Sequence, residues 1–440
     1  MKSPRTLLLV LVSLPVCGFA QAPPPAAQAS EAQRAGRQLD FSLQGGGSWS
    51  DNVARVPFDE EDGTIARAGA RLKYRDVTRR FDSNIDVNAM YEHYTDDTFD
   101  DNVIGGADAS VIFGIVPERF LWDFQENFGQ VTSDPFAATT PENRENINYF
   151  STGPDLILQF GAATSLKVSG RFSDVNYELS NVDNQQTSAT VDLTRQSSSS
   201  ASIGLIGELN RIDFKDEVNP DYDRNQAYLR YRLHNSRTEL TFDGGYTTLN
   251  SDNGDEGGLL ARVQMTRRVS SAASLSARVG TEFSDSGDVF RSGQAALGAS
   301  QTTSNVVGSS DPFENRFAIL AYDFDRNRTG LGVNLQYRRE LYVNETSLDR
   351  TVMVWGLYFT RRLSPRLDTR IYADFEKQDF DNSDFESDET RAGASLNLAL
   401  GRTVSLRFAF DRVAYESSDA SNEYTENQAS LFVVWAPVRQ

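Results

Sequence analysis

The sequence of 440 residues predicts an all-β fold: a transmembrane up-and-down antiparallel β-barrel of about 16–20 strands, with 18–20 as the best estimate. Three observations predict this class. Apolar and polar residues alternate along most of the chain, short connections alternate with longer acidic ones, and the N-terminus has the composition of an export signal. Together these features favour a membrane barrel over a soluble sandwich.

The alternation is clearest between Thr390 and Arg412. Leu396 and Leu398 alternate with Ser395 and Asn397, and a second run with the same pattern follows a short turn. On a strand, period two places successive side chains on opposite faces. One face is purely apolar here, and the other carries charged, amide and hydroxyl groups. A sandwich would bury the apolar face against a second sheet, whereas a membrane barrel turns it toward lipid.

The same pattern recurs from Leu39 to a last apolar run that ends at Trp435, which gives about 20 strands. Strand boundaries from one sequence are imprecise, so 16 to 20 is the expected range. Apart from the N-terminal region, no apolar run has the length of a membrane-spanning helix.

Two kinds of connection alternate along the chain. One kind is short and basic or small, as in Val116–Arg119 and Gly401–Thr403. The other is mostly longer and rich in Asp, Glu, Asn and Ser: Asp51–Gly63, Thr95–Asn102, Thr132–Asn146, Asp216–Asn225, Asn250–Gly257, Asp285–Glu314, Asp381–Glu389 and Glu416–Glu426. Outer-membrane barrels have short periplasmic turns and longer extracellular loops. The acidic loops are therefore expected outside, and the turns and both termini in the periplasm.

The N-terminus predicts three segments: a signal peptide at 1–20, a disordered Ala/Pro/Gln-rich spacer at 21–38, and a barrel at 39–440. Lys2 and Arg5 precede a short apolar run that ends in small residues, so cleavage is expected near Ala20. Cys17 is the only cysteine and lies inside this signal, although a lipoprotein site at Cys17 is an alternative. Cleavage near Ala20 would leave no disulfide, catalytic thiol or thiolate-bound metal.

Composition excludes one class of partner. The formal net charge is −19 and 39% of residues are hydrophobic. Phosphate contacts need Lys and Arg surfaces, so nucleic-acid binding is not expected. The hydrophobic fraction suits a barrel in which only alternate residues face lipid.

The segment Gly45-Gly46-Gly47-Ser48-Trp49-Ser50-Asp51-Asn52-Val53 carries a family resemblance. It resembles the start of the outer-membrane β-barrel porins often encoded beside exopolysaccharide export genes, which likewise open with a strand that runs into an Asp-Asn element. The resemblance covers about ten residues and implies an outer-membrane barrel without a cofactor, with a role in moving secreted polysaccharide. The chain departs from the usual C-terminal aromatic signal of such barrels, because five residues follow Trp435.

Charged residues on the polar faces are the candidate site. They form an expected basic wall and an expected acidic wall of the lumen: Arg230, Arg232, Arg262 and Arg278 on one, and Asp82, Asp86 and Asp108 on the other. Charges of both signs are expected inside a wet pore. Arginine forks suit carboxylates and hydroxyls, so an acidic or neutral polysaccharide or small anions are expected along the basic wall. The alternative is mutual neutralisation, with an interior filled by paired side chains or by an inserted loop such as Asp285–Glu314.

Little in the sequence predicts catalysis or metal binding. His93 and His234 are the only histidines, and no catalytic residue, metal ligand or cofactor is expected. His93 lies in the acidic segment Tyr91–Asp97, so a hydrolase at the barrel rim that uses His93 is a remote alternative. The acidic runs at Asp59–Asp62 and Asp96–Asp101 are expected to be solvated loops.

The function expected from these features is a porin-like passive pore or exit duct, serving exopolysaccharide export in the outer membrane of a Gram-negative cell. The expected partners are outer-membrane lipids and lipopolysaccharide, a polysaccharide, and a periplasmic export lipoprotein. The main alternative is a structural or adhesive surface barrel that binds a partner through its acidic loops.

Overall fold

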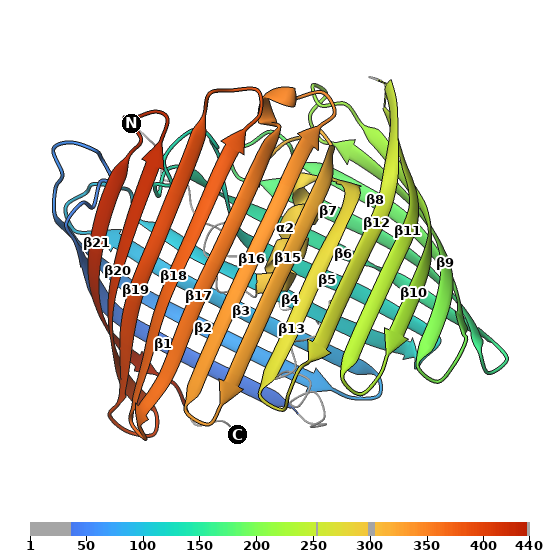
Figure 1. Ribbon diagram of the computed structural model, residues 1–440, viewed down its shortest axis with the longest axis horizontal. Helices are drawn as coiled ribbons and strands as arrows, with labels where there is room; N and C mark the ends of the chain where they lie inside the picture. The colour runs from blue at the N-terminus through green and yellow to red at the C-terminus, as the bar shows by residue number, and fades with distance from the viewer. Residues whose placement is uncertain (1–36, 252–253, 298–303, 438–440) are drawn as a thin grey trace, which may run out of the picture.

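The computed structural model describes residues 37–251, 254–297 and 304–437. Within them, twenty antiparallel strands close into a barrel (Figure 1). One further short strand, β14, lies in a loop and pairs in parallel with β5. The expected fold class is therefore confirmed, and the count lies at the top of the expected range. The expected signal peptide and all but the last two residues of the expected spacer lie outside the described residues.

The first ten strands of the barrel are β1 (Gln38–Ser50), β2 (Gly63–Val77), β3 (Phe81–Tyr94), β4 (Asn102–Val116), β5 (Phe120–Thr132), β6 (Arg144–Phe160), β7 (Thr164–Tyr177), β8 (Asn184–Gln196), β9 (Ala201–Phe214) and β10 (Tyr222–His234). The other ten are β11 (Thr238–Ser251), β12 (Gly254–Arg268), β13 (Ala273–Ser284), β15 (Phe313–Arg326), β16 (Thr329–Tyr342), β17 (Arg350–Ser364), β18 (Leu367–Phe380), β19 (Glu386–Ala399), β20 (Val404–Ser417) and β21 (Tyr424–Trp435). Between them lie α2 (Ser286–Leu297), β14 (Ser304–Val307) and the short 3-10 helix η1 (Thr346–Leu348).

The connections follow the expected asymmetry. One end of the barrel, called the short-turn end here, carries turns of 2–4 residues such as 78–80 and 365–366. The opposite, long-loop end carries connections of 5–28 residues, except where β11 meets β12. No helix in the described parts of the chain is long and apolar enough to cross a membrane.

One expected loop is a strand pair instead. Asn250–Gly257 was expected to be a connection, but β11 and β12 remain paired as far as Ser251 and Gly254. Backbone pairing does not depend on side-chain polarity, and strands that extend into water tolerate polar residues on both faces. An acidic, glycine-containing segment therefore does not by itself mark the end of a strand.

The outer face of the barrel carries the apolar set of residues. Leu205, Leu229, Phe242 and Leu335 are each more than 40% exposed, although they are large hydrophobic side chains. An apolar band of this kind around a closed barrel is the surface that faces lipid in transmembrane barrels. The interior face carries the polar set, as the alternation predicts.

The Asp-Asn element closes the barrel. Beyond the last β1 pair, Asp51 accepts hydrogen bonds from the backbone N–H and the side-chain amide of Asn427, both at 2.7 Å. Asn52, which is fully buried, donates to the carbonyl of Thr425 at 3.1 Å. β1 pairs with β21 over eight positions but with β2 over thirteen. These side chains therefore extend a short seam, and residues 50–52 together with their β21 partners are called the clasp.

Charge on the lipid face should be costly. Leu398→Arg or Phe408→Arg is expected to reduce the free energy of unfolding by about 2–4 kcal/mol at mid-membrane, because a guanidinium would enter hydrocarbon. Ser395→Arg and Asn397→Arg, on the interior face of the same hairpin, should be tolerated. Urea titration of the barrel refolded in lipid measures both pairs, and an equal loss for the two faces would contradict the assignment.

The clasp should set the stability of the seam. Asp51→Ala is expected to cost about 1–3 kcal/mol, because two partly buried amide donors lose their acceptor. The temperature at which the folded gel band converts to the unfolded band should fall. Glu60→Ala, an exposed change in the same loop, is the matched control and should leave that temperature unchanged. A clasp variant as heat-resistant as this control would refute the role.

Candidate functional site

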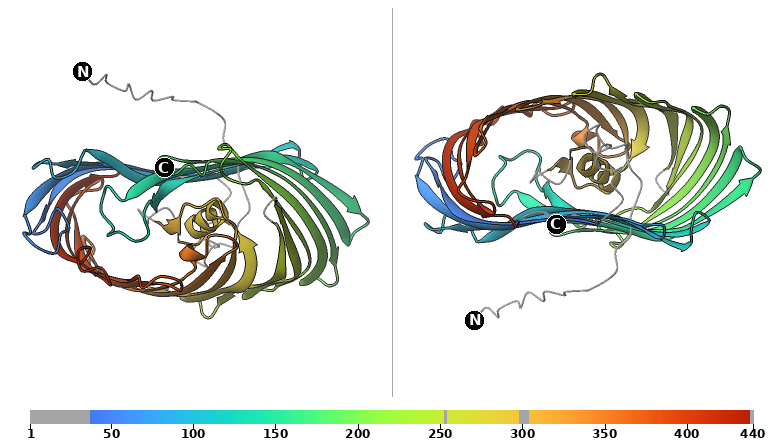
Figure 2. Two further views of the ribbon diagram at one scale, coloured as in Figure 1. Left: turned by 90° about the horizontal axis from the view of Figure 1, so that it is seen from above. Right: turned by 90° about the horizontal axis from the view of Figure 1, so that it is seen from below.

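The connection between β13 and β15 enters the barrel and forms α2 there (Figure 2). Asp285 caps the helix, since its carboxylate accepts the backbone N–H of Asp288 at 2.8 Å. Asp288 adds negative charge to the first turn, where the helix dipole favours it. The described residues of this connection, 285–297 and 304–312, are called the plug segment.

The plug segment bridges the two long walls of the barrel. Val289 and Phe290 of α2 and Val306 of β14 belong to one buried apolar cluster. The cluster takes wall residues from β5–β7 on one side and from β15 and β16 on the other: Val131, Ile147, Tyr149, Val175, Tyr177, Phe313 and Tyr342. At the height of this cluster, the plug segment therefore crosses the interior from one wall to the other.

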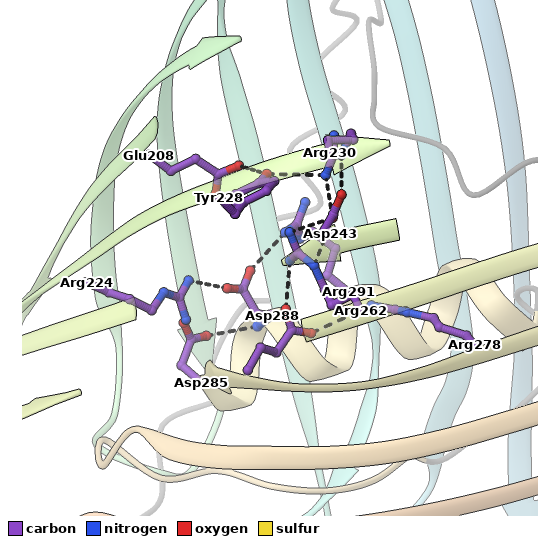
Figure 3. Close-up of polar contacts among 11 residues, drawn as sticks. Glu208, Arg224, Tyr228, Arg230, Asp243, Arg262, Arg278, Asp285, Asp288 and Arg291 are labelled. Atoms are coloured by element: carbon purple, nitrogen blue, oxygen red, sulfur yellow. Dashed lines mark hydrogen bonds and ion pairs between the residues drawn. The ribbon is translucent and has the colours of Figure 1, made fainter. Parts of the chain in front are cut away.

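A single arginine holds the start of α2. Arg224 of β10 donates to Asp285 at 3.1 Å and also binds Asp288, and its side chain is only 8% exposed. Arg291, one helical turn later, pairs with Asp288 at 2.9 Å and lies 5.2 Å from the centre of the Tyr149 ring. Figure 3 shows these groups converging on the N-terminal turn of the helix.

The two carboxylates differ in proton affinity. Burial and the neighbouring charge of Asp288 raise the pKa of Asp285 to about 6. Burial also opposes ionisation of Asp288, but the guanidinium groups of Arg224 and Arg291 outweigh it and lower the pKa of Asp288 below its ordinary value. Asp288 is therefore the carboxylate that stays charged and holds the arginines.

Two further wall arginines hold the plug segment beyond α2. Arg338 and Arg350, from β16 and β17, donate to the side-chain and backbone oxygens of Asn305 at 2.9 and 2.8 Å. Arg350 is 1% exposed and forms an ion pair with the equally buried Glu340 at 2.7 Å. A buried cation with this many acceptors is satisfied by protein groups alone.

Three of the four arginines expected in the basic wall lie in one cluster beside α2. Arg230 and Arg262 share the carboxylate of Asp243, at 2.6 and 3.0 Å, and their guanidinium groups lie over the ring of Tyr228. Arg262 also pairs with Glu282 at 2.7 Å, and Arg278 is 3.8 Å from the same carboxylate. This wall is therefore a paired network rather than a bare positive surface (Figure 3).

The remaining expected site residues lie apart from this cluster. Arg232 is 3.8 Å from Asp192 on β8. Asp86 binds Arg71 at 2.8 Å and Lys73 at 3.0 Å, and Asp108 lies directly opposite Asp86 across β3 and β4. Asp82 lies on the same interior face of β3, four residues from Asp86.

The bridge formed by the plug segment separates the two expected walls. On one side of it lie β8–β13, called the smaller compartment, which carry Arg230, Arg262 and Arg278. On the other side lie β17–β21 and β1–β4, called the larger compartment, which carry the acidic wall. Solvent access is lowest in the arginine cluster beside α2: the side chains of Arg230 and Arg262 are about 21–22% exposed, against 51% for Lys73 and 38% for Arg71. Arg232, which lies apart from that cluster on β10, is 42% exposed.

The connection between β5 and β6, residues 133–143, covers the larger compartment at the long-loop end and is called the roof loop. Figure 2 shows it projecting inside the ring of strands. Its Phe136 packs against Phe380 and Phe385, with ring centres 4.7 and 5.4 Å apart. Arg55, from the β1–β2 loop, donates to the carbonyl of Thr139 at 2.7 Å. The roof loop therefore reaches from β5 and β6 to the opposite wall.

His93 lies outside the barrel interior. It follows the outward-facing positions of β3, and its Nδ1 lies 2.7 Å from Asp101, with both side chains nearly half exposed. Tyr91 donates to the same carboxylate at 2.5 Å. Across the described ranges, no group of three or more His, Cys, Asp or Glu residues is placed to hold a metal ion.

Sequence reasoning missed Arg224, Arg291, Asp285 and Asp288, which attach α2. It also missed Asp243 and Glu282, the partners of the basic wall. Period two assigns a residue to the interior but gives neither its height nor its partner. A useful signal was available for the helix: Ser286–Asp288 and Val289–Phe290 place a polar first turn before an apolar pair.

Comparisons with known proteins give no family. No protein-family model matches the chain, and no curated protein matches it. Three similar solved structures have identities of 10–12%. They are a mutant ferric enterobactin receptor (PfeA) from Pseudomonas aeruginosa (10% identity, TM-score 0.44, 92% of this chain and 81% of that one), OccAB4 from Acinetobacter baumannii (12%, 0.37, 93% and 99%) and OccK2 from Pseudomonas aeruginosa in complex with glucuronate (11%, 0.36, 91% and 98%). Likenesses this distant indicate no function for the chain.

Asp288 should hold the plug segment in place over a wide pH range. Because its pKa is lowered, its contribution is present above the ordinary carboxyl value and is lost only as pH falls below that value. Asp288→Asn is expected to reduce the free energy that holds α2 in place by about 3–5 kcal/mol, because Arg224 loses a largely buried partner. Hydrogen exchange by mass spectrometry should show loss of amide protection in α2 at both pH 5 and pH 8.

Asp285→Asn is the matched control for that experiment. Asparagine also caps helices, and at pH 5 the wild-type Asp285 is mostly protonated because its pKa is raised. This variant should therefore match the wild type at pH 5 and be at least as well protected at pH 8, because a raised pKa means that ionisation of Asp285 costs the attached state free energy. Full protection of α2 in Asp288→Asn would show that the apolar cluster alone attaches it.

Proposed function

We propose that this protein is a passive pore or exit duct in the outer membrane of a Gram-negative cell, and that it serves exopolysaccharide export. The long-loop end would face outside and the short-turn end the periplasm, as in other barrels of this architecture. Solute would pass through the larger compartment, because the smaller one is bordered by the buried network that holds α2.

The observation that carries this proposal is the accessible charged wall of the larger compartment. Arg370 and Arg407 are exposed and lie on interior positions of β18 and β20. The side chain of Lys73 is about half exposed, and that of Arg71 is more than a third exposed. Ionised side chains on the inner face of a membrane barrel need water or a counter-charge. Their exposure supports a wet interior on this side, and a barrel of 16 or more strands is wide enough for one.

The polysaccharide and its partners are the less direct part of the proposal. They rest on the likeness of Gly45–Val53 to barrels often encoded beside exopolysaccharide export genes. The partners proposed are lipopolysaccharide and lipids around the apolar band, the polysaccharide itself, and a periplasmic export lipoprotein at the short-turn end. Polysaccharide synthases and an export lipoprotein beside this gene would support the duct, and their absence would leave a general pore.

A structural or adhesive surface barrel is the second candidate, and two observations favour it. The plug segment crosses the interior, and the roof loop covers the larger compartment. If both close the interior to solutes, the acidic loops are left as the part that meets a partner. Conductance measurements separate the two functions.

Removing the roof loop should increase conductance. Replacement of residues 135–141 by a Gly-Ser linker of equal length removes Phe136 and the Arg55 contact, so the outer mouth of the larger compartment should open. The expected result in planar bilayers is a several-fold increase in single-channel conductance over the wild type. The matched control replaces residues 215–221, a loop of the same length over the smaller compartment, and should change little.

The same recordings test which wall sets selectivity. In the roof-replaced barrel, Asp82→Asn, Asp86→Asn and Asp108→Asn together should raise anion preference, most at low salt where screening is weakest. Changing Arg230, Arg232, Arg262 and Arg278 to Ser should alter selectivity less. If neither the wild type nor the roof-replaced barrel conducts, even after deletion of 285–314, the pore proposal fails and the surface barrel replaces it.

A further inference from the structure

Six interior residues form a row along the hydrogen-bonding direction, which runs from β15 and β16 into the wall of the larger compartment. In cross-strand register, Asp323 of β15 lies opposite Gly332, Gly332 opposite Tyr358, and Tyr358 opposite Tyr372. Tyr372 in turn lies opposite Gly393 of β19, and Gly393 opposite Asp411 of β20. The order Asp-Gly-Tyr-Tyr-Gly-Asp is symmetric about its centre. These six residues are called the tyrosine row.

Each tyrosine lies along the wall and reaches outward along the row. A Cβ atom at position 332 would collide with the Tyr358 ring, and the Tyr358 hydroxyl donates to Asp323 at 2.9 Å. The other half repeats this, with the Tyr372 ring against Gly393 and its hydroxyl donating to Asp411 at 2.5 Å. Glycine is needed at both positions because a side chain would lift the ring off the wall. The result is two adjacent aromatic rings anchored at opposite ends.

Charge around the row is mainly negative. Asp323 and Asp411 terminate it, and Asp374 lies one position above Tyr372 on the same face of β18. Beside Tyr358 lies Arg370, which is exposed and whose guanidinium is 5.1 Å from the centre of the ring. Arg391 on β19 is paired with Glu389. An anionic ligand would therefore be repelled at this site.

Packing alone does not account for the row. Tyr228, in the smaller compartment, is only 3% exposed, as a purely structural tyrosine would be. Tyr358 and Tyr372 remain partly accessible, and so does Arg370. Aromatic surface that stays accessible beside hydrogen-bonding groups is typical of a ligand site.

We propose that the tyrosine row binds a neutral saccharide chain as it passes through the barrel. The C–H face of a pyranose ring stacks on an aromatic face, and its hydroxyls donate to carboxylates and accept from Arg370. Each carboxylate retains free acceptor positions after the tyrosine hydroxyl has bound. This inference rests on the proposed function and deepens it, because it selects an uncharged saccharide over a uronate or a small anion.

The test uses the whole barrel purified in detergent and isothermal titration with two probes of equal length, maltohexaose and hexagalacturonate. The wild type should bind maltohexaose and bind hexagalacturonate more weakly. Tyr358→Ala and Tyr372→Ala should each weaken maltohexaose binding by roughly tenfold, equivalent to about 1.4 kcal/mol. Tyr358→Phe and Tyr372→Phe keep the rings and should retain most of the affinity. Tyr337→Ala, on the outer face of β16, is the matched control and should bind as the wild type does.

Three results would overturn the inference: no binding of maltohexaose by folded wild type, preference for hexagalacturonate, or unchanged affinity in the two alanine variants. Retained heat-modifiable mobility shows that each variant is folded, and the phenylalanine variants remain informative if an alanine variant is not. Conductance of the same preparations separates this inference from the proposed function. A barrel that conducts ions but binds no saccharide refutes only the proposed role of the tyrosine row. A barrel that binds maltohexaose but does not conduct refutes only the proposed pore.

Discussion

The backbone ladder of a membrane barrel must close on itself, and the rest of this structure depends on that requirement. In hydrocarbon, an unpaired N–H or C=O group costs several kcal/mol, so an open sheet edge is not tolerated. Here closure depends on β1 and β21, which share only eight paired positions. The clasp continues the seam with side-chain hydrogen bonds where the ladder stops. A motif that resembles a family signature therefore has a physical task in this chain.

Closure leaves an interior too wide for side chains to fill, and the protein divides it. The plug segment joins two walls that lie many strands apart, so the charged faces of β3–β4 and β10–β13 do not meet. The arginines beside α2 are matched by carboxylates on neighbouring strands and on the helix itself. Arg224 holds the crossing element in place, while the exposed residues Lys73, Arg370 and Arg407 lie on the other side of it.

The alternation of apolar and polar residues determines how much of this structure could be predicted from the sequence. It assigned Leu398 outward and Asn397 inward, and the alternation of connections placed short turns at one end and long loops at the other. Both depend only on local sequence. The pairing of Arg230 with Asp243 depends on register between strands, and the place of Arg224 depends on where a distant loop inserts. Neither is encoded locally. α2 contains Gly287 and Gly293, which lower helix propensity, and its stability comes from the apolar cluster and from Arg224.

The position of the plug segment also constrains the order of assembly. Ser284 and Phe313 are direct ladder partners, so the β13–β15 hairpin can form with the whole insert outside it. The buried cluster around Phe290, however, includes Tyr149 of β6 and Tyr342 of β16. α2 therefore has no complete environment until strands from both halves of the chain are in place. The element that divides the interior must be among the last to settle, entering a barrel whose walls already exist.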